Sequence, residues 1–118
     1  INRQKYPLSV IEDALVNSSG LRHQVYTQLS KLIQQRRRLS AFHPDNPVMI
    51  FQSDNALLMM KRYQPDSGEG LLCVFNLSGR QVKAQLPEAH LFQDVVSGEK
   101  IDGTQPVTLD AWQFMWLR

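Results

Sequence analysis

The hydrophobic residues of this chain change their spacing near residue 42, and this change constrains the fold more than any other feature. Before that point, apolar residues recur every three or four positions, as they do on one face of a helix. After it, short apolar runs alternate with turn residues, as in a series of β-strands. The charge divides at the same place, with +5 on residues 1–41 and −3 on residues 42–118. We therefore expect a helical segment followed by a small β-structured segment.

Two helices are predicted before residue 42. The first is expected to open at Ser9, because Ser9 and Glu12 have the spacing of a capping box, in which each side chain bonds the other residue's backbone N–H. The segment 17–20 contains Asn, Ser and Gly and is expected to end this helix. His43 and Pro44 are expected to stop the second helix. Its apolar stripe consists of Leu21, Val25, Leu29, Leu32 and Ile33.

Short strands are predicted from residue 48 onward. Residues 48–52 and 56–63 are expected to pair as a hairpin, and residues 71–77 to form a buried strand. Strands at this spacing after a helix pair predict an α+β chain that ends in an antiparallel β-sandwich. Further strands are expected at residues 81–86, 91–96 and 113–117, with tight turns at 97–98 and 102–103.

The residue content argues against several kinds of site. Cys73 is the only cysteine, so an intrachain disulfide or a cysteine metal cluster is impossible, and its thiol is expected to stay protonated within an apolar strand. The three histidines, His23, His43 and His90, lack the spacing of zinc ligands. A net charge of +2 and the divergent directions of Arg36–Arg38 around a helix argue against a nucleic-acid site. No apolar run is long enough for a membrane-spanning helix.

The acidic residues show no catalytic pair. Glu12 and Asp13 are adjacent on one helix, so their side chains point in different directions. Neither a nucleophile elbow nor a phosphate-binding glycine loop is present in the sequence. The remaining candidates lie in turn segments, where aspartate is favoured for backbone reasons: Asp54, Asp66, Asp94, Asp102 and Asp110.

One aromatic pattern is open to two interpretations. Trp112, Phe114 and Trp116 alternate, so they would share one face of a strand. Such a stripe most often faces the core of a sandwich. If it were exposed, it could stack on sugar rings. The chain would then be a stand-alone β-sandwich module that binds carbohydrate or a protein partner.

Three segments carry a resemblance to a known family. The segment Ile-Asn-Arg-x-x-Tyr at residues 1–6 resembles the one that follows the eighth barrel strand in sucrose phosphorylases and their close relatives, within the α-amylase glycoside hydrolase superfamily. Leu-x-x-Leu-Ile-x-x-Arg at 29–36, followed by Ala-Phe-His-Pro at 41–44, is similar to the last barrel helix and its exit. Asn-Leu-Ser at 76–78 recurs in the C-terminal sandwiches of these enzymes.

The resemblance covers the chain in order and implies a domain organisation. Residues 1–43 would be the final loop and helices of a catalytic barrel, and residues 44–118 a C-terminal β-sandwich domain. A complete barrel needs about 250 residues. Because the chain has 118 residues and begins with Ile1 instead of Met, we expect it to be a piece of a longer protein. The remainder of that polypeptide would be its principal partner.

The family's chemistry is implied by the same resemblance. These enzymes transfer an α-glucosyl unit with retention, using a nucleophilic Asp and an acid/base Glu that lie upstream in the barrel. Inorganic phosphate, or a hydroxyl of a sugar or glycerate, accepts the glucosyl unit. The resemblance implies no metal, no cofactor, no catalytic residue within this chain and, because the family uses intracellular phosphate, a cytoplasmic enzyme. The isolated chain is expected to be catalytically silent.

Arg3 is the one position with an implied substrate role. It matches the arginine that holds a hydroxyl of the glucosyl ring in the donor subsite of the family. A guanidinium can hold a sugar hydroxyl and an acidic partner at once, which would fix the position of the ring. The alternative is that Arg3 only bridges neighbouring loops, as we expect for Asn2 and Tyr6.

Overall fold

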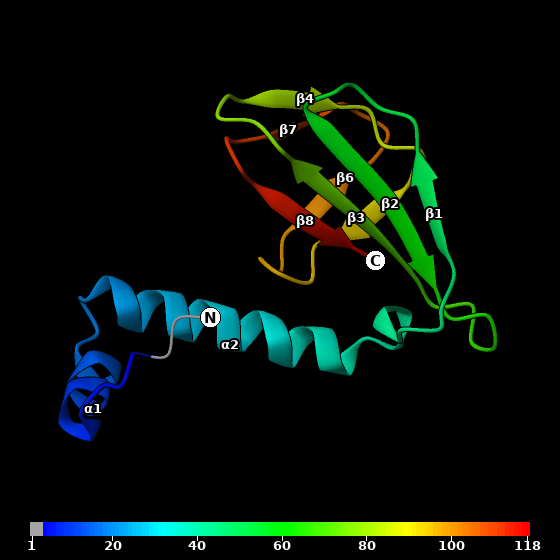
Figure 1. The fold of residues 1–118 in the computed structure, drawn as a ribbon. Helices are drawn as coiled ribbons and strands as arrows, with labels where there is room; N and C mark the ends of the chain where they lie inside the picture. The colour runs from blue at the N-terminus through cyan, green and yellow to red at the C-terminus, as the bar shows by residue number, and fades with distance from the viewer. Residues whose placement is uncertain (1–3) are drawn as a thin grey trace. The chain divides into compact units, whose positions relative to one another are not determined.

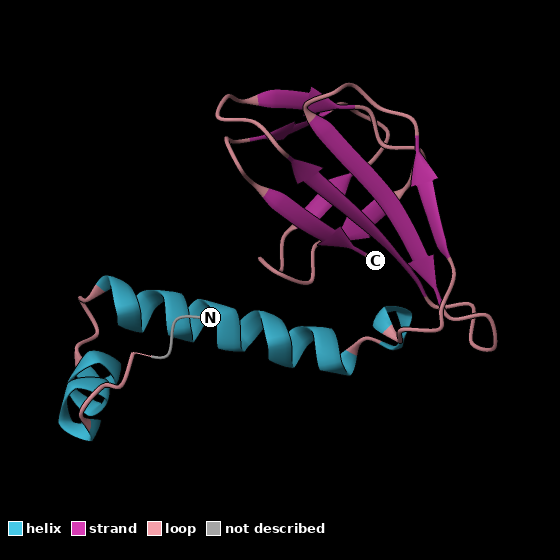
Figure 2. Cartoon of the chain, in the orientation of Figure 1, coloured by secondary structure: helices cyan, strands magenta, loops and turns pink. Residues whose placement is uncertain are grey.

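The computed structural model describes residues 4–118. The chain divides into two compact units, Ile1–Arg36 and Arg37–Arg118. Helices dominate the first unit and strands the second, as Figure 2 shows, so the predicted order of helices and strands is confirmed. The assignment of residues 1–43 and 44–118 to two domains of an enzyme stays a prediction.

The first helix, α1, spans Leu8–Val16, and it begins earlier than the sequence predicts. Pro7 is the N-cap, and its carbonyl oxygen accepts the backbone N–H groups of Val10 at 3.1 Å and Ile11 at 3.4 Å. Ser9 therefore lies inside the helix, and no side chain caps the N-terminus. The predicted capping box is wrong, because the ring of Pro7 presets the backbone for the start of a helix two residues before Ser9.

The second helix, α2, spans Leu21–Arg38, as the apolar stripe predicts. Gly20 ends the connection from α1, and its N–H donates to the carbonyl oxygen of Asn17 at 2.9 Å. The ring of His23 bonds the carbonyl oxygen of Leu15 and so ties the start of α2 to the end of α1. No residue of either helix is buried.

A four-stranded antiparallel sheet is the largest element of the second unit. Its strand order is β1 (Val48–Phe51), β2 (Leu57–Tyr63), β3 (Gly70–Asn76) and β8 (Phe114–Leu117), and Figure 1 shows these four strands side by side. The predicted hairpin is confirmed as β1 and β2, with Ile50 opposite Met60. Cys73 lies opposite Met60 on one side and Trp116 on the other.

Two smaller sheets complete the second unit, and both are antiparallel. β4 (Val82–Ala84) pairs with β7 (Val107–Leu109), and β5 (Leu91–Gln93) pairs with β6 (Lys100–Asp102). The sequence predicts β4 and β5 but misses β6 and β7. β6 ends at Asp102, which is predicted as part of a turn, and β7 lies between Pro106 and Asp110, so turn residues hide both strands.

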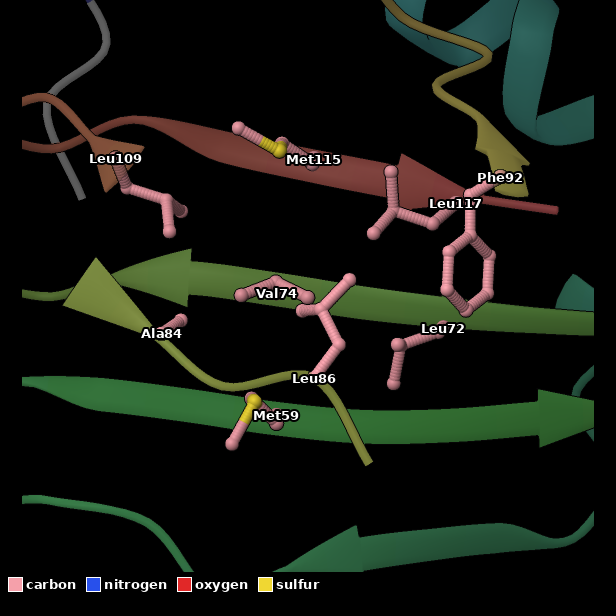
Figure 3. Close-up of a cluster of buried hydrophobic side chains, with 9 residues drawn as sticks. All are labelled: Met59, Leu72, Val74, Ala84, Leu86, Phe92, Leu109, Met115 and Leu117. Carbon is pink, nitrogen blue, oxygen red and sulfur yellow. The ribbon is translucent and has the colours of Figure 1, made fainter. Parts of the chain in front are cut away.

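The main hydrophobic core joins side chains of all three sheets, as Figure 3 shows. The four-stranded sheet contributes alternate residues of β3 and β8, and the smaller sheets contribute residues that face them. This core consists of Met59, Leu72, Val74, Ala84, Leu86, Phe92, Leu109, Met115 and Leu117.

A second buried cluster lies on the opposite face of the four-stranded sheet. It contains Leu71 and Cys73 from β3, together with Leu39 and Ala41 from the segment around the short helix η1 (Ser40–Phe42). Arg62 holds this segment, because its Nε donates to the carbonyl oxygen of Ala41 at 3.1 Å. Both faces of β3 are therefore covered, which explains its continuous apolar sequence.

Candidate functional site

The residue with an implied substrate role, Arg3, lies outside the described residues, as does Asn2. The last residue of the same motif, Tyr6, is described and is exposed. Its hydroxyl donates to Oε1 of Gln4 at 3.0 Å. The expected roles of Arg3 and Asn2 therefore stay predictions.

Tyr6 borders a hollow of about 270 Å³ in the first unit. The side chains around it come from α1, except for Tyr6 before the helix and Arg22 at the start of α2. Among the described residues, no carboxylate, thiol or hydroxyl other than that of Tyr6 lines the hollow, so these residues offer a packing surface. Its lining consists of Tyr6, Val10, Ile11, Ala14, Leu15 and Arg22.

The apolar stripe of α2 is uncovered among the described residues. Leu21, Val25, Leu29 and Ile33 follow one another at four-residue intervals, and each is at least half exposed. Side chains of this kind each contribute about 1.5–3 kcal/mol when they are fully buried. The stripe is thus a large apolar surface that the described residues leave mostly exposed.

A second hollow, of about 200 Å³, lies in the β-structured unit and has a polar lining. Lys61 forms an ion pair with Glu88, and Nδ1 of His90 lies 4.0 Å from the other oxygen of that carboxylate. The imidazole of His90 packs against Phe92 with ring centroids 3.9 Å apart. Within residues 4–118, Glu88 is the only acidic side chain in the lining, so the described residues give this hollow no carboxylate pair of the kind a retaining glycosidase uses.

The predicted turn aspartates are bound in turns, as expected. Asp94 is buried, and its carboxylate accepts the N–H groups of Val96 at 3.2 Å, Ser97 at 3.1 Å and Trp116 at 2.9 Å. Its Oδ2 also accepts the hydroxyl of Ser97 at 2.7 Å. Asp102 is exposed, and hydrogen bonds from the side chain and backbone of Thr104 lower the pKa of its carboxyl. These contacts give both aspartates structural roles.

Asn76, the first residue of the Asn-Leu-Ser segment, joins two loops through hydrogen bonds. Nδ2 of Asn76 donates to the carbonyl oxygens of Arg80 and Asp110, each at 2.7 Å. Its Oδ1 accepts the N–H of Ser78 at 3.0 Å and the hydroxyl of Ser78 at 2.7 Å. Asn76 is buried, so only a side chain with both donors and acceptors satisfies these groups.

Cys73 is buried and chemically inert, as the sequence predicts. Desolvation by its apolar surroundings raises the pKa of the Cys73 thiol to about 12, and the positive charge of Arg62 opposes the shift only in part. The thiol is therefore protonated at neutral pH and is no nucleophile.

The aromatic stripe is not a single face, which corrects both interpretations of it. Trp112 lies in the turn before β8, is 67% exposed and has a positive φ of 61°. Phe114 and Trp116 lie on β8 and are half-buried, the first against Phe75 and the second against Phe42. The expected inward packing into the main core is wrong, since β8 gives that core Met115 and Leu117.

Residues 4–118 also bear on the predicted absence of a metal site. Within this range, no group of three His, Cys, Asp or Glu side chains is placed to hold a metal ion. Arg36–Arg38 are exposed at the end of α2. None of the described helices combines the length and the apolar character needed to cross a membrane.

The chain matches two curated relatives along nearly its whole length, although no family model matches it. Glucosylglycerate phosphorylase of Escherichia coli (strain K12) is 36% identical over 118 residues, which are 100% of this chain and 21% of that protein. Glucosylglycerate phosphorylase of Spirochaeta thermophila is 24% identical over 131 residues, covering 99% of this chain and 22% of that protein. The chain thus spans about a fifth of the length of these relatives.

Solved structures of two carbohydrate-active enzymes share the fold. The α-glucosyl transfer enzyme XgtA superposes with a TM-score of 0.63 at 21% identity, over 93% of this chain and 19% of its own. Pullulanase type I of Bacillus subtilis superposes with a TM-score of 0.61 at 15% identity, over 81% of this chain and 16% of its own. The fold is thus one found in carbohydrate-active enzymes.

The resemblance indicated by the sequence motifs is confirmed by these matches. The chain is similar to the C-terminal part of the glucosylglycerate phosphorylases.

Proposed function

We propose that the chain forms the closing part of a phosphorylase that transfers α-glucosyl units, of the sucrose phosphorylase and glucosylglycerate phosphorylase kind. The observation that carries this proposal is the 36% identity to the Escherichia coli enzyme over the whole of the chain. Residues 1–43 supply the last loop and helices of the catalytic barrel, and residues 44–118 supply a β-sandwich that closes the enzyme. Such an enzyme works in the cytoplasm, where inorganic phosphate is available.

The exposed apolar surfaces of the helices support the barrel origin. The stripe on α2 and the hollow beside α1 are apolar and remain uncovered among the described residues. Neighbouring barrel helices and strands would cover them, since a helix with one apolar stripe is stabilised mainly by packing that stripe.

The chemistry of the whole enzyme follows the retaining route. A carboxylate attacks the anomeric carbon while a carboxylic acid protonates the leaving oxygen, and a glucosyl–enzyme ester forms. Phosphate then attacks the same carbon as the second group takes its proton, which releases glucose 1-phosphate with the original anomeric configuration. The two carboxyl groups must lie about 5 Å apart, and they are supplied by the barrel upstream of this chain. The chain alone is catalytically silent.

The whole natural protein provides the first test. Incubated with glucosylglycerate and inorganic phosphate, it is expected to release glucose 1-phosphate, whereas residues 1–118 alone release none. Glycerate, fructose and a phosphorylated sugar, each supplied with glucose 1-phosphate, identify the acceptor by the reverse reaction. Glucosyl transfer by the isolated chain would contradict the proposal. So would a natural gene product close to 13.6 kDa, because it has no room for the catalytic carboxylates.

Arg3 provides the second test, in the whole protein. Replacing Arg3 with Ala removes a charged hydrogen bond to the sugar, and kcat/KM is expected to fall about 10- to 100-fold. Lys5 is the matched control, because it lies in the same segment at a position that the family motif leaves open, and Lys5→Ala should leave kcat/KM within about twofold of the wild type. An unchanged kcat/KM for Arg3→Ala would make Arg3 a residue that only bridges loops.

A further inference from the structure

The turn before β8 holds Trp112 in a strained backbone conformation, although its side chain is largely exposed. Trp112 has a φ of 61° and is the only residue other than glycine with a positive φ among residues 4–118. Glycine or asparagine adopts this backbone readily, whereas a bulky side chain is strained in it. The indole is nevertheless 67% exposed, so it recovers only part of its possible burial energy. A strained, exposed aromatic residue points to a binding role outside the contacts seen here.

The turn is also held rigidly. The N–H of Trp112 donates to the carbonyl oxygen of Ser78 at 3.0 Å. Gln113 closes the turn twice, since its N–H donates to the carbonyl oxygen of Asp110 at 3.1 Å and its Oε1 accepts the N–H of Asp110 at 2.7 Å. The buried Asn76 binds the same carbonyl oxygen at 2.7 Å. A side chain presented from such a turn loses little conformational entropy when it binds a ligand.

The segments on either side of the indole carry polar groups that suit a sugar. The ring lies against Gly79, where a Cβ would be 3.6 Å from Cζ2, an ordinary contact. Gln81 follows Gly79 by two residues and Asp110 precedes Trp112 by two. Nε2 of Gln81 donates to Oδ1 of Asp110 at 2.8 Å, and both side chains are exposed. The amide oxygen of Gln81 and Oδ2 of Asp110 have no further partner among the described residues, so they can bind hydroxyl groups.

We propose that Trp112, Gln81 and Asp110 form a carbohydrate-binding surface on which the C–H face of an α-glucoside stacks on the indole. The hydroxyl groups at the edge of the sugar then bond the amide of Gln81 and the carboxylate of Asp110. A protein partner is the weaker fit, since protein-binding anchors usually lie within a wider apolar patch, whereas Asp110 and Gln113 of the same turn are polar. This binding surface goes beyond the proposed function, because it requires no catalytic carboxylate.

Fluorescence of a single tryptophan tests the proposal on the 118-residue chain. The chain has two tryptophans, so Trp116→Phe leaves Trp112 as the only reporter. Titration with maltotriose is expected to change its emission saturably, with half-saturation on the order of millimolar. Gln81→Ala in the same background should weaken binding about two- to tenfold. Glycerol at equal mass concentration is the control for bulk solvent effects.

Calorimetry with maltotriose gives a second reading that does not depend on the reporter. Trp112→Gly removes the ring while allowing the same backbone conformation, so the turn is expected to persist and the binding heat to vanish. Circular dichroism checks that each variant is folded. The proposal is overturned by an emission change that is linear and equal in glycerol, or by binding that persists in Trp112→Gly. It is also overturned if sedimentation shows a dimer and the emission of Trp112 shows that its ring is shielded without sugar.

Discussion

The helical unit and the β-structured unit use their apolar residues in opposite ways. In α1 and α2 no side chain is buried, and the apolar stripe of α2 is open. In residues 37–118, two clusters cover both faces of β3 and draw on all three sheets. A regular apolar period is thus enough to form a helix but does not provide a core. Residues 37–118 contain the packing they need, whereas the helices display packing surface that the described residues do not use.

The largest effect is expected when a buried leucine of the β-structured unit is replaced, in comparison with an exposed leucine of the helices. Leu109 is 0% exposed and Leu29 is 55% exposed. Leu109→Ala is expected to lower the free energy of unfolding by about 2–5 kcal/mol, because it leaves a cavity in the main core. Leu29→Ala should change it by less than about 0.5 kcal/mol, since little burial is lost and alanine favours a helix. Urea unfolding followed by circular dichroism measures both free energies of unfolding. Equal losses would mean that the two leucines contribute equally to stability, despite their different exposure.

A smaller effect is expected at Gly103, the glycine with the least room for a side chain among those of residues 37–118. A Cβ there would lie 2.6 Å from Cε2 of Phe92 and 2.7 Å from the carbonyl oxygen of Glu88. Gly103→Ala is therefore expected to cost about 1–3 kcal/mol through overpacking. Gly98→Ala is the control, because Gly98 has a φ of 83° with open space around it and should show only backbone strain of about 1 kcal/mol. A Gly103→Ala variant as stable as the wild type would show that the core yields easily.

The effect that is smallest near neutral pH concerns Cys73, and it appears only at high pH. Its thiol has an ordinary pKa of 9.0 and a folded-state pKa of about 12, so the unfolded chain loses this proton first as the pH rises. Stability is thus intact below pH 9 and falls between pH 9 and 12, by up to about 1.4 kcal/mol per pH unit. Unfolding of the wild type and of Cys73→Val, measured from pH 8 to 10.5, isolates this contribution from other titrating groups. Parallel stability curves would mean that the thiol is not desolvated.

Local patterns predicted most of the fold. The stripe from Leu21 to Ile33 indicated α2, and the apolar run at 71–77 indicated a strand covered on both faces. The incorrect predictions also have local causes. Ser9 resembles a helix cap, but Pro7 begins the helix first. Strands β6 and β7 are short and lie beside the turn residues Asp102, Pro106 and Asp110, which hide them in the sequence.

The candidate binding surface was only partly predictable. Alternation marked Trp112 as an aromatic residue that could stack on a sugar, but it placed Phe114 and Trp116 on the same face. The positive φ at Trp112 breaks that alternation, and nothing in the neighbouring sequence signals it. Gln81 and Asp110 lie 29 residues apart and meet only in the folded chain.

The kinds of structural element, their order and the resemblance to α-glucosyl-transferring enzymes can be recognised in the amino-acid sequence alone. Hydrophobic period and turn residues act over a few positions, so they are visible without a fold. Which face of β8 enters the main core depends on the folded chain. Met115 and Leu117 face the smaller sheets and are buried, while Phe114 and Trp116 face the other side. That choice depends on which strands lie opposite, and it is made by contacts between residues far apart in the chain.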